Sequence, residues 1–500
     1  MKKYDDLVVG SGISGLTMAL FLAMNGRKVL LIEKSPSIGG SIAVFYKNGI
    51  PFDTGFHFTG GLQKGGMLHD MLSVLGLYDL IQPVFLPEDN ANSFYFEPEN
   101  KTYEFPYGFG KLREKFKNYF PSDAAAVDKY FDKVLHVCAN TPSMNLRTLT
   151  VAQNWLDEDF VSLQEVLDGL TGNAVLKALL SGFAMCYGVR PREISFASHS
   201  RICFGLYESV ARIKGGGASL IEAFKKRFAE YDIEVSCNSY ISGIADIRNK
   251  RAGRFILNTG DEIEAENCVL TIHPKEILKL IPENLSSKAF ISRVSSFETS
   301  AGFFALFAAL DSGYNEDDSG SSIVSLFPHT DINRLLDPEY KGAEALVIIR
   351  STEEVNGKSQ RIVNVLGTSF MEHVKQWEGT AREKRPQEYK DYKLERVESI
   401  KKRIFILYPD YKEHLTVMDS ASVLTFRDYL NSHDGSAYGI KQKAGQYNLI
   451  GKLPVRNMYA AGQSALLPGI IGAMMSSFVV GKSIVKDERY SSFMDRNLCS

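Results

Sequence analysis

The clearest pattern of apolar and polar positions lies near the start of the chain. The apolar run Leu7–Val9 leads into a glycine-rich turn, Gly10–Gly15, and a long apolar stretch follows. A second strand-like run, Lys28–Ile32, ends at the acid Glu33. This order predicts a strand, a turn, a helix and a second strand, as in a βαβ unit whose strands lie parallel in one sheet.

Each glycine of the turn has a physical task in such a unit. Gly10 permits the tight turn, Gly12 lets the backbone approach a diphosphate, and Gly15 lets helix and sheet pack closely. The free N–H groups and the positive end of the helix dipole would hold the diphosphate. Glu33 follows at roughly the twenty-residue distance at which a carboxylate accepts hydrogen bonds from a ribose diol, and it would repel a 2′-phosphate. The motif therefore predicts an NAD-like or FAD-like dinucleotide, with contacts at Gly10, Ser11, Gly12, Ile13, Ser14, Gly15, Glu33 and Lys34.

A second glycine pair favours FAD over NAD. Gly39-Gly40-Ser41 would bring more backbone close to the cofactor, which a plain NAD domain does not need. The acid followed by a glycine pair resembles the FAD-binding fingerprint of glutathione-reductase-like and amine-oxidase-like flavoproteins. Phe52–Phe58 contains an Asp-Thr-Gly turn similar to the one those proteins place beside the flavin. The resemblance implies FAD contacts at Gly39, Gly40, Ser41 and Phe56.

The end and the middle of the chain resemble the same flavoproteins. Asn457–Gln463 is similar to their C-terminal strand, and Pro468–Met474 would begin a helix whose N-terminus faces the flavin pyrimidine. A helix dipole suits that place because a reduced flavin is anionic near N1. In the middle segment, an aliphatic residue at the position of Ile241 packs near the adenine in this fold. The resemblance implies further contacts at Ile241, Gly462, Gln463, Ile470 and Met474.

These motifs predict an α/β protein in which separated segments build one domain. Its fold class is a discontinuous, glutathione-reductase-like Rossmann domain for FAD beside a mixed α+β substrate domain with a helical part. The expected FAD-binding segments are 1–75, 205–280 and 440–490, and the expected substrate-binding segments are 76–204 and 281–439. Residues 76–200 are predicted to be mainly helical with aromatic-rich connections, and Ile233–Cys237 is predicted as a strand that Tyr240–Ile244 continues.

Composition excludes several other classes of protein. The formal charge of −2 shows no basic footprint for nucleic acid. The six cysteines are scattered and include no CxxC, which argues against a zinc site or a dithiol redox centre, and no metal site is predicted. Free cysteines fit a reducing compartment, so a cytoplasmic location is expected.

Three stretches bear on membrane contact. The uncharged runs Leu7–Gly26 and Asn457–Gly481 are interrupted by glycines or Pro468, so we interpret both as strand-turn-helix rather than spanning segments. Arg382–Arg403 is rich in charge and has apolar residues at helical spacing. A solvated surface helix is the favoured interpretation, and a basic, peripheral contact with a membrane is the alternative.

Four stretches together resemble one family over the full length of the chain. They are Asp6–Ser41, Asp53–Phe58, Leu424–Gly439 and Gly462–Met474. The chain is similar to the phytoene desaturase, carotenoid isomerase and retinol saturase family of FAD enzymes. The Thr-x-x-x-Tyr…Gly-x-x-Tyr-Gly pattern in the third stretch is more particular to this family than the glycine turn. The Asp-Thr-Gly-x-His-Phe variant resembles retinol saturases more than the bacterial desaturases.

The resemblance implies an FAD-dependent oxidoreductase that acts on C=C or C–C bonds of a lipophilic polyene or isoprenoid. Such an enzyme moves a hydride to or from flavin N5 as a saturase, desaturase or cis–trans isomerase. A desaturase would pass electrons to oxygen or a quinone, whereas a saturase needs a reductant such as a reduced nicotinamide. Two alternatives stay open: a flavin amine oxidase, for which no aromatic cage is located, and a non-catalytic FAD-binding protein.

Two residues are candidates for chemistry. His57 is the titratable residue expected near the isoalloxazine, where it would donate a proton or orient the substrate, unless it is simply hydrogen-bonded within its loop. Tyr438 would line the substrate cavity or pack in the core. The apolar run Gly302–Phe307 fits a substrate tunnel and an ordinary core strand equally well. The lipid, the direction of electron flow, the redox partner and the oligomeric state are open at this stage.

Overall fold

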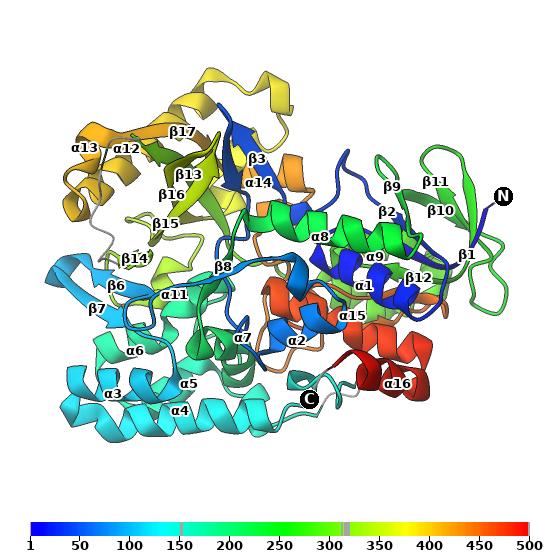
Figure 1. The fold of residues 1–500 in the computed structure, drawn as a ribbon, viewed down its shortest axis with the longest axis horizontal. Coiled ribbons are helices and arrows are strands. Elements are labelled where there is room, and N and C mark those ends of the chain that lie inside the picture. Colours follow the sequence, from blue (N-terminus) through cyan, green and yellow to red (C-terminus); the bar gives the residue numbers. More distant parts are fainter. Residues whose placement is uncertain (1, 151–153, 312–313, 315–320, 499–500) are drawn as a thin grey trace.

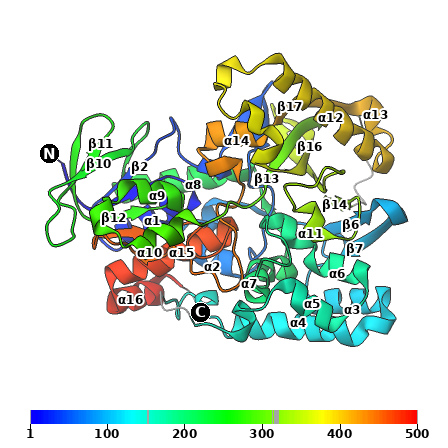
Figure 2. The same ribbon diagram turned by 180° about the vertical axis from the view of Figure 1, so that it is seen from behind.

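A computed structural model describes residues 2–150, 154–311, 314 and 321–498. Two large sheets lie at opposite ends of the molecule, each covered by helices, with the helical segment of the first half of the chain below the second sheet (Figure 1). Seen from behind, α14 (Val423–Leu430) lies between the two sheets (Figure 2). The fold class is therefore α/β, as predicted.

The eight-stranded sheet is built from three separated parts of the chain. Strand order is β10-β11-β12-β1-β2-β9, and β19 pairs with both β12 and β18. β1 pairs in parallel with β2 and β12, β2 with β9, and β12 with β19. The bounds are β1 (Lys2–Val9), β2 (Val29–Ile32), β9 (Glu234–Ser236), β10 (Ile241–Ala245), β11 (Arg254–Leu257), β12 (Glu262–Leu270), β18 (Gly451–Lys452) and β19 (Met458–Ala460).

Apolar side chains on both faces hold helices against this sheet. One face carries α1 (Ile13–Met24), α8 (Gly216–Glu230) and α15 (Gly469–Val485), with α2 (Met67–Val74) and α16 (Asp487–Asn497) outside them; the other carries α9 (Pro274–Leu280) and α10 (Lys288–Ser295). Helix α1 is buried from Ile13 to Ala23, as expected for a helix that is apolar on all sides. Its Phe21 packs edge-on against Phe478, and a Cβ at Gly481 would lie 2.6 Å from the Phe21 ring. A residue without a side chain is therefore needed for α1 and α15 to pack this closely.

The seven-stranded sheet has a mostly antiparallel order, β17-β13-β16-β15-β14-β6-β7. Its β13 is buried at every position, and α12 packs Val397, Ile400 and Ile404 against one face. The bounds are β6 (Asn92–Phe96), β7 (Lys101–Phe105), β13 (Gly302–Leu310), β14 (Ile323–Phe327), β15 (Leu346–Val355), β16 (Lys358–Ser369), β17 (Leu415–Ala421), α11 (Ile332–Leu335), α12 (Gln387–Leu407) and α13 (Tyr411–His414).

Two small sheets and a helical segment complete the fold. The small sheets are the hairpin β3 (Val44–Lys47) with β4 (Ile50–Asp53), and the pair β5 (Pro83–Phe85) with β8 (Ala211–Ile213). The helices are α3 (Phe109–Tyr119), α4 (Ala124–Ala139), α5 (Leu163–Leu170), α6 (Ala174–Ser181) and α7 (Phe196–Glu208). Phe94, Phe96 and Phe105 join this helical segment to the seven-stranded sheet in one core.

The expectation that residues 76–200 are mainly helical is confirmed by α3 to α6 and the start of α7. The aromatic-rich connections between the helices were predicted incompletely, because among the described residues of this range they include the strands β5, β6 and β7. The Ile233–Ile244 region is not one continuing strand. Asn238 has a φ of +54° and turns the chain, so that β9 pairs with β2 whereas β10 pairs with β11.

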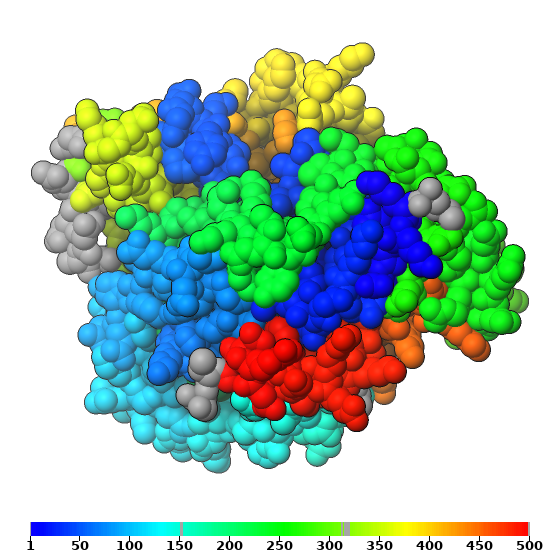
Figure 3. All heavy atoms as spheres, turned by 45° about the vertical axis from the view of Figure 1, so that its right-hand side comes forward, coloured from blue at the N-terminus to red at the C-terminus, as the bar shows by residue number. Residues whose placement is uncertain are grey.

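The stretches considered for membrane contact form ordinary elements. Leu7–Gly26 is the end of β1, the glycine turn and α1, and Asn457–Gly481 contains β19 and most of α15. No helix among the described residues is long and apolar enough to cross a membrane. On one face of the molecule the N-terminal segment, in blue, lies against the C-terminal helices, in red (Figure 3). Chain ends that are far apart in sequence thus meet at the same sheet.

Candidate dinucleotide and catalytic site

The glycine turn after β1 has the geometry of an anion cradle. Gly10 has a φ of +94°, and a Cβ on Gly15 would lie 1.8 Å from the Gly10 carbonyl oxygen, so neither position accepts a side chain. A Cβ on Gly12 would meet nothing within 4 Å, which leaves open space in front of α1. No side chain of the residues that the structure describes caps the first turn of α1, and this turn contains no acid. Its free N–H groups are therefore available to a diphosphate.

The acid after β2 is held beside this turn. Glu33 is buried, and its Oε2 accepts hydrogen bonds from Ser11 N at 2.8 Å and from Ser11 Oγ at 2.7 Å. Its Oε1 accepts one from Ser35 N at 2.7 Å. A carboxylate has about four acceptor positions, so these three bonds orient Glu33 and leave capacity for a ribose hydroxyl. Lys34 is exposed, and its ammonium lies 5.9 Å from the ring centroid of Tyr240.

The second glycine pair lies directly against the first turn. Gly39, with a φ of +122°, donates its N–H to the Ser11 carbonyl oxygen at 3.1 Å. A Cβ on Gly40 would lie 3.2 Å from the Gly12 Cα. Ser41 is exposed at the start of the short helical turn that follows. The structure therefore brings the two glycine motifs into one backbone surface around Gly12.

The central and C-terminal segments reach the same edge of the sheet. Thr271 follows β12 and donates its hydroxyl to the Val9 carbonyl oxygen at 2.9 Å, whereas a Cβ on Gly462, after β19, would lie 3.5 Å from the Thr271 carbonyl oxygen. Ser14 on α1 and Ser477 on α15 share a hydrogen bond of 2.6 Å. Carboxyl ends of parallel strands meet at one sheet edge, so these segments form one site.

The remaining predicted cofactor residues lie around this edge. Gly462 donates its N–H to Ser476 Oγ at 2.7 Å, and the partly buried Gln463 follows it. Ile470 and Met474 occupy the first turns of α15, where Met474 is fully buried. Ile241 is buried at the start of β10, two residues beyond Ser239, whose N–H donates to the Glu33 carbonyl oxygen at 2.8 Å. Ile13 is buried in the first turn of α1.

His57 is buried beside the nucleotide half. Its side chain is 6% exposed, and among the described residues neither ring nitrogen has a hydrogen-bond partner. Burial and the positive charge of Arg212 lower the pKa of His57 to about 4. The imidazole is therefore neutral near pH 7, and its unpaired nitrogens are free to bond to a ligand. Phe56, also buried, belongs to the core that contains α1 and α15.

A partly buried cluster of charged residues contacts the loop that carries His57. Arg212 on β8 donates from Nε to the His57 carbonyl oxygen at 3.2 Å and from Nη2 to Glu353 Oε1 on β15 at 2.9 Å. Asp53 accepts from the Gly217 N–H at 3.1 Å, and burial raises its pKa to about 6. Asp53, Arg212 and Glu353 line one small cleft. Asp53 belongs to the Asp-Thr-Gly turn identified in the sequence, whereas sequence reasoning missed Arg212 and Glu353 because no local pattern distinguishes them.

Tyr438 belongs to a separate part of the site. Its backbone N–H donates a hydrogen bond to Ser300 Oγ at 3.0 Å, and its ring lies edge-on to Phe303 with centroids 6.1 Å apart. Burial raises the pKa of the Tyr438 hydroxyl well above its ordinary range, so the phenol is neutral. Among the described residues no hydrogen bond or ring contact joins Tyr438 to His57. The two candidates for chemistry are thus held by different segments.

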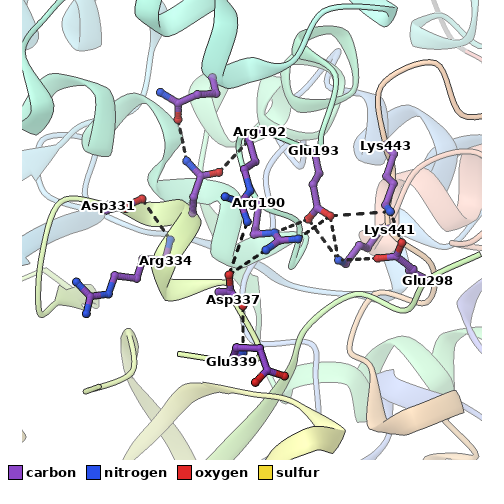
Figure 4. A network of polar contacts seen from close by, with 12 residues as sticks. Arg190, Arg192, Glu193, Glu298, Asp331, Arg334, Asp337, Glu339, Lys441 and Lys443 are labelled. Carbon is purple, nitrogen blue, oxygen red and sulfur yellow. Dashed lines mark hydrogen bonds and ion pairs between the residues drawn. The ribbon is translucent and has the colours of Figure 1, made fainter. Parts of the chain in front are cut away.

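An ion-pair network fixes the loop that follows Tyr438 (Figure 4). Lys441 contacts Glu193 at 3.2 Å and Glu298 at 3.0 Å, and Arg190 binds Glu193 from the other side at 2.8 Å. Although burial opposes it, Arg190 and Lys441 hold the pKa of Glu193 at about 2. These ion pairs therefore join three separated segments, at Glu193, at Glu298 and at Lys441, which is close in sequence to Tyr438.

Comparisons with known proteins agree with this geometry. A family model described as an NAD(P)-binding Rossmann-like domain matches residues 8–74. All-trans-retinol 13,14-reductase from Macaca fascicularis is 24% identical over 99% of this chain and 87% of that protein. Chloroplastic prolycopene isomerase from Daucus carota is 21% identical over 99% of this chain and 83% of that protein. The structure of cyclohexylamine oxidase from Brevibacterium oxydans IH-35A superposes with a TM-score of 0.63 at 12% identity and covers 99% of both chains.

The structural likeness establishes a shared fold, and the matched Rossmann-like segment fits a dinucleotide cofactor. The sequence likeness extends over almost the whole chain at low identity. Together these findings confirm the predicted resemblance to the phytoene desaturase, carotenoid isomerase and retinol saturase family, and with it the predicted enzyme type: an oxidoreductase similar to all-trans-retinol 13,14-reductase.

Proposed function

We propose that this protein is an FAD-dependent oxidoreductase that acts on C=C or C–C bonds of a lipophilic polyene of the retinoid or carotenoid type. The observation that carries the proposal is the likeness to a retinol reductase and a prolycopene isomerase along 99% of the chain. A polyene substrate needs apolar surroundings rather than charged clamps. The aromatic strand β13, which is buried throughout, suits such surroundings.

Three features support FAD as the dinucleotide. The second glycine pair adds backbone around Gly12, and the open space there fits a diphosphate. The segment after β19 returns to the same sheet edge, where Gly462 has a φ of +114°. The first turn of α15 carries no acid, so its positive dipole end is available to an anionic ring system. The residues we assign to FAD are those described above, from Gly10 to Met474.

The domain roles follow from this assignment. The eight-stranded sheet and its helices would bind FAD, and the seven-stranded sheet with the helical segment would bind the substrate. Bound flavin would supply hydride transfer at N5. The chain itself would orient the substrate with the neutral imidazole of His57, which has an N–H donor and no charge to solvate. Buried aromatic side chains such as Phe303 would exclude water.

Saturation, desaturation and isomerisation differ in their products, so one experiment separates them. Reduced enzyme is incubated without oxygen with retinoids and carotenoids, and the products are analysed by mass. A saturase adds two hydrogens, an isomerase changes retention without changing mass, and a desaturase removes two hydrogens when oxidised enzyme and a quinone or oxygen are supplied. No change with any polyene, together with oxidation of amines, would instead support an amine oxidase, whose fold this chain shares.

A flavin that is bound but is neither reduced nor reoxidised by any of these compounds would favour a non-catalytic FAD-binding protein. Loss of turnover in His57→Ala with FAD still bound is expected, and full activity of that variant would remove His57 from the mechanism. Lipid mass spectrometry of cells with and without the active protein would name the substrate. A reduced nicotinamide, quinone or oxygen as electron partner, a cytoplasmic location and peripheral membrane contact are further parts of this proposal, which fractionation of the same cells would test.

A further inference from the structure

A short turn from the other half of the molecule lies against the proposed nucleotide site. Helix α14 ends at Leu430, and we call the segment after it, Asn431–Gly435, the strap. At one end, Asn431 Nδ2 donates a hydrogen bond to Ser35 Oγ at 2.9 Å. At the other end, the ring of His433 stacks on the ring of His273, with centroids 4.4 Å apart and planes 12° apart. One turn thus contacts two separate points of the eight-stranded sheet.

Sheet order shows what lies between these two points. Ser35 follows β2 and His273 follows β12, and these are the two parallel neighbours of β1. The turn Gly10–Gly15 follows β1, so it lies between the two contact points at the same carboxyl edge. The strap therefore reaches from one neighbour of β1 to the other across the edge where a diphosphate would bind.

Hydrogen bonds and close packing at its C-terminal end, which we call the base, hold the strap in a defined turn. Ser436 Oγ donates to the His433 carbonyl oxygen at 2.8 Å, and the Gly435 N–H donates to the Ser432 carbonyl oxygen at 3.2 Å. A Cβ on Gly435, which has a φ of +64°, would lie 2.2 Å from the Val423 carbonyl oxygen, so this base is closely packed on the start of α14. The turn keeps its shape through these contacts, which are independent of the nucleotide half.

The contacts between the strap and the nucleotide half are fewer and more exposed than the contacts that hold the strap's own base. Asn431 is exposed, and within the described part of the chain its side chain makes one hydrogen bond to the nucleotide half. His433 is partly exposed, and besides the stacking its Nδ1 lies 3.6 Å from Glu276 Oε1 on α9. Contacts of this kind, solvent-exposed and few in number, open locally without unfolding of the protein.

We propose that the strap completes the nucleotide site and retains the bound dinucleotide, which enters or leaves when the Asn431–Ser35 and His433–His273 contacts open. This inference rests on the proposed FAD site and adds residues from the substrate-binding half to it. Asn431 and His433 would then set how long the cofactor stays bound, while the glycine turn sets the diphosphate contacts.

Release of FAD from the purified holoprotein tests the strap. Free FAD is more fluorescent than bound FAD, so the release rate follows from the fluorescence rise after dilution. Asn431→Ala and His433→Ala are each expected to speed release several-fold, and the double variant about tenfold, since each exposed contact is modest. The spectrum of the bound flavin should not change. Unchanged release from the double variant would overturn the proposal.

The chain offers a matched control for each substitution. Asn100 has a φ of +46° and one side-chain hydrogen bond, from Tyr95, in the β6–β7 hairpin of the other sheet. His414, the last residue of α13, stacks on Tyr314 with centroids 4.5 Å apart and lies next to Asp311. Asn100→Ala and His414→Ala lose similar contacts far from the nucleotide sheet (Figure 1). Both should release FAD at the rate of the unchanged protein, and faster release from them would show a general loosening instead.

A cross-link closes the strap directly. Ser35→Cys and Asn431→Cys are combined in a Cys237→Ser background, because Cys237 lies next to Asn238, whose N–H donates to the Ser35 carbonyl oxygen. When the bridge forms over bound FAD, release should slow at least tenfold, and reductant should restore it. When it forms in protein stripped of FAD, uptake of FAD should be blocked. An unaltered release rate, or failure of the bridge to form, would contradict the strap.

The failure of the strap is distinguishable from the failure of the proposed function. A protein that never binds FAD contradicts the cofactor and the strap together. A protein that binds FAD, turns over a polyene and releases FAD equally fast with the strap altered or bridged contradicts the strap alone.

Discussion

The two large sheets place functional groups by different physical means. In the eight-stranded sheet, parallel strands bring the turns after β1, β12 and β19 to one edge, and backbone geometry decides which residues are allowed there. In the seven-stranded sheet, antiparallel pairing of β13 with the distant strands β16 and β17 buries aromatic rings, and β15 within this sheet carries Glu353, which binds Arg212. We propose that the first region binds its ligand mainly through backbone groups, whereas the second region supplies side chains.

This difference has a consequence for substitutions. At a backbone site, adding any side chain changes the space or the charge that a ligand meets. At a side-chain site, removing one partner of an ion pair leaves the other charge shielded from water and unpaired, which destabilises the fold. The following predictions test each region by the change to which it should be most sensitive.

The largest effect is expected at Gly12. A Cβ there meets nothing, so Gly12→Asp should fold, but its carboxylate would lie close to the diphosphate. Two like charges about 4 Å apart repel by ~4 kcal/mol at an effective dielectric constant near 20, which corresponds to roughly 10³-fold weaker FAD binding. Titration of apoprotein with FAD measures the affinity. FAD bound with unchanged affinity would remove the diphosphate from this turn.

Gly15→Ala should damage the fold rather than the ligand contacts. The new Cβ would lie 1.8 Å from the Gly10 carbonyl oxygen, so β1 and α1 must move apart. Overpacking of this kind is expected to lower the free energy of unfolding by about 3 kcal/mol. Gly12→Ala is the matched control and should change it by less than about 1 kcal/mol. Equal urea unfolding curves for the two variants would show that the close approach of Gly15 to Gly10 does not affect the free energy of unfolding.

His57 should make the free energy of unfolding depend on pH. Its pKa is about 4 in the folded protein and 6.5 in the unfolded chain, so the unfolded state binds more protons between these values. The resulting stabilisation is fully present above pH 6.5 and is lost as the pH falls towards 4. His57→Gln should remove up to about 3 kcal/mol of this pH-dependent stabilisation, because each unit of pKa difference is worth about 1.36 kcal/mol. Urea unfolding from pH 7 to pH 4 measures it, and the exposed His136→Gln serves as control.

Arg212→Gln tests the charge cluster behind His57. It removes the partner of the half-buried Glu353 carboxylate and should cost about 2 kcal/mol of folding free energy. Because the Arg212 charge contributes to the low pKa of His57, that pKa should rise in the variant. NMR titration of ¹³C-labelled histidine, with the His57 signal assigned from His57→Gln, checks the shift. An unmoved His57 titration would show that Arg212 does not act on the imidazole.

Sequence reasoning succeeded where local geometry restricts the residue type. The turn Gly10–Gly15 and the fold class were predicted because few residues tolerate a φ of +94° or a 1.8 Å approach. It missed β6, since this strand is buried at every position and lacks the alternation that identifies a strand. It also missed Arg212 and Glu353. Their meeting depends on the pairing of β8 with β5 and on the place of β15 in its sheet, which no nearby residue specifies.

The central claim is a dinucleotide site that holds FAD at the edge shared by β1, β12 and β19. The most direct measurement is the absorption spectrum of the purified protein, followed by release and chromatography of its cofactor. We expect a yellow protein that bleaches with dithionite and releases one FAD per chain. Colourless protein that does not bind added FAD would contradict it.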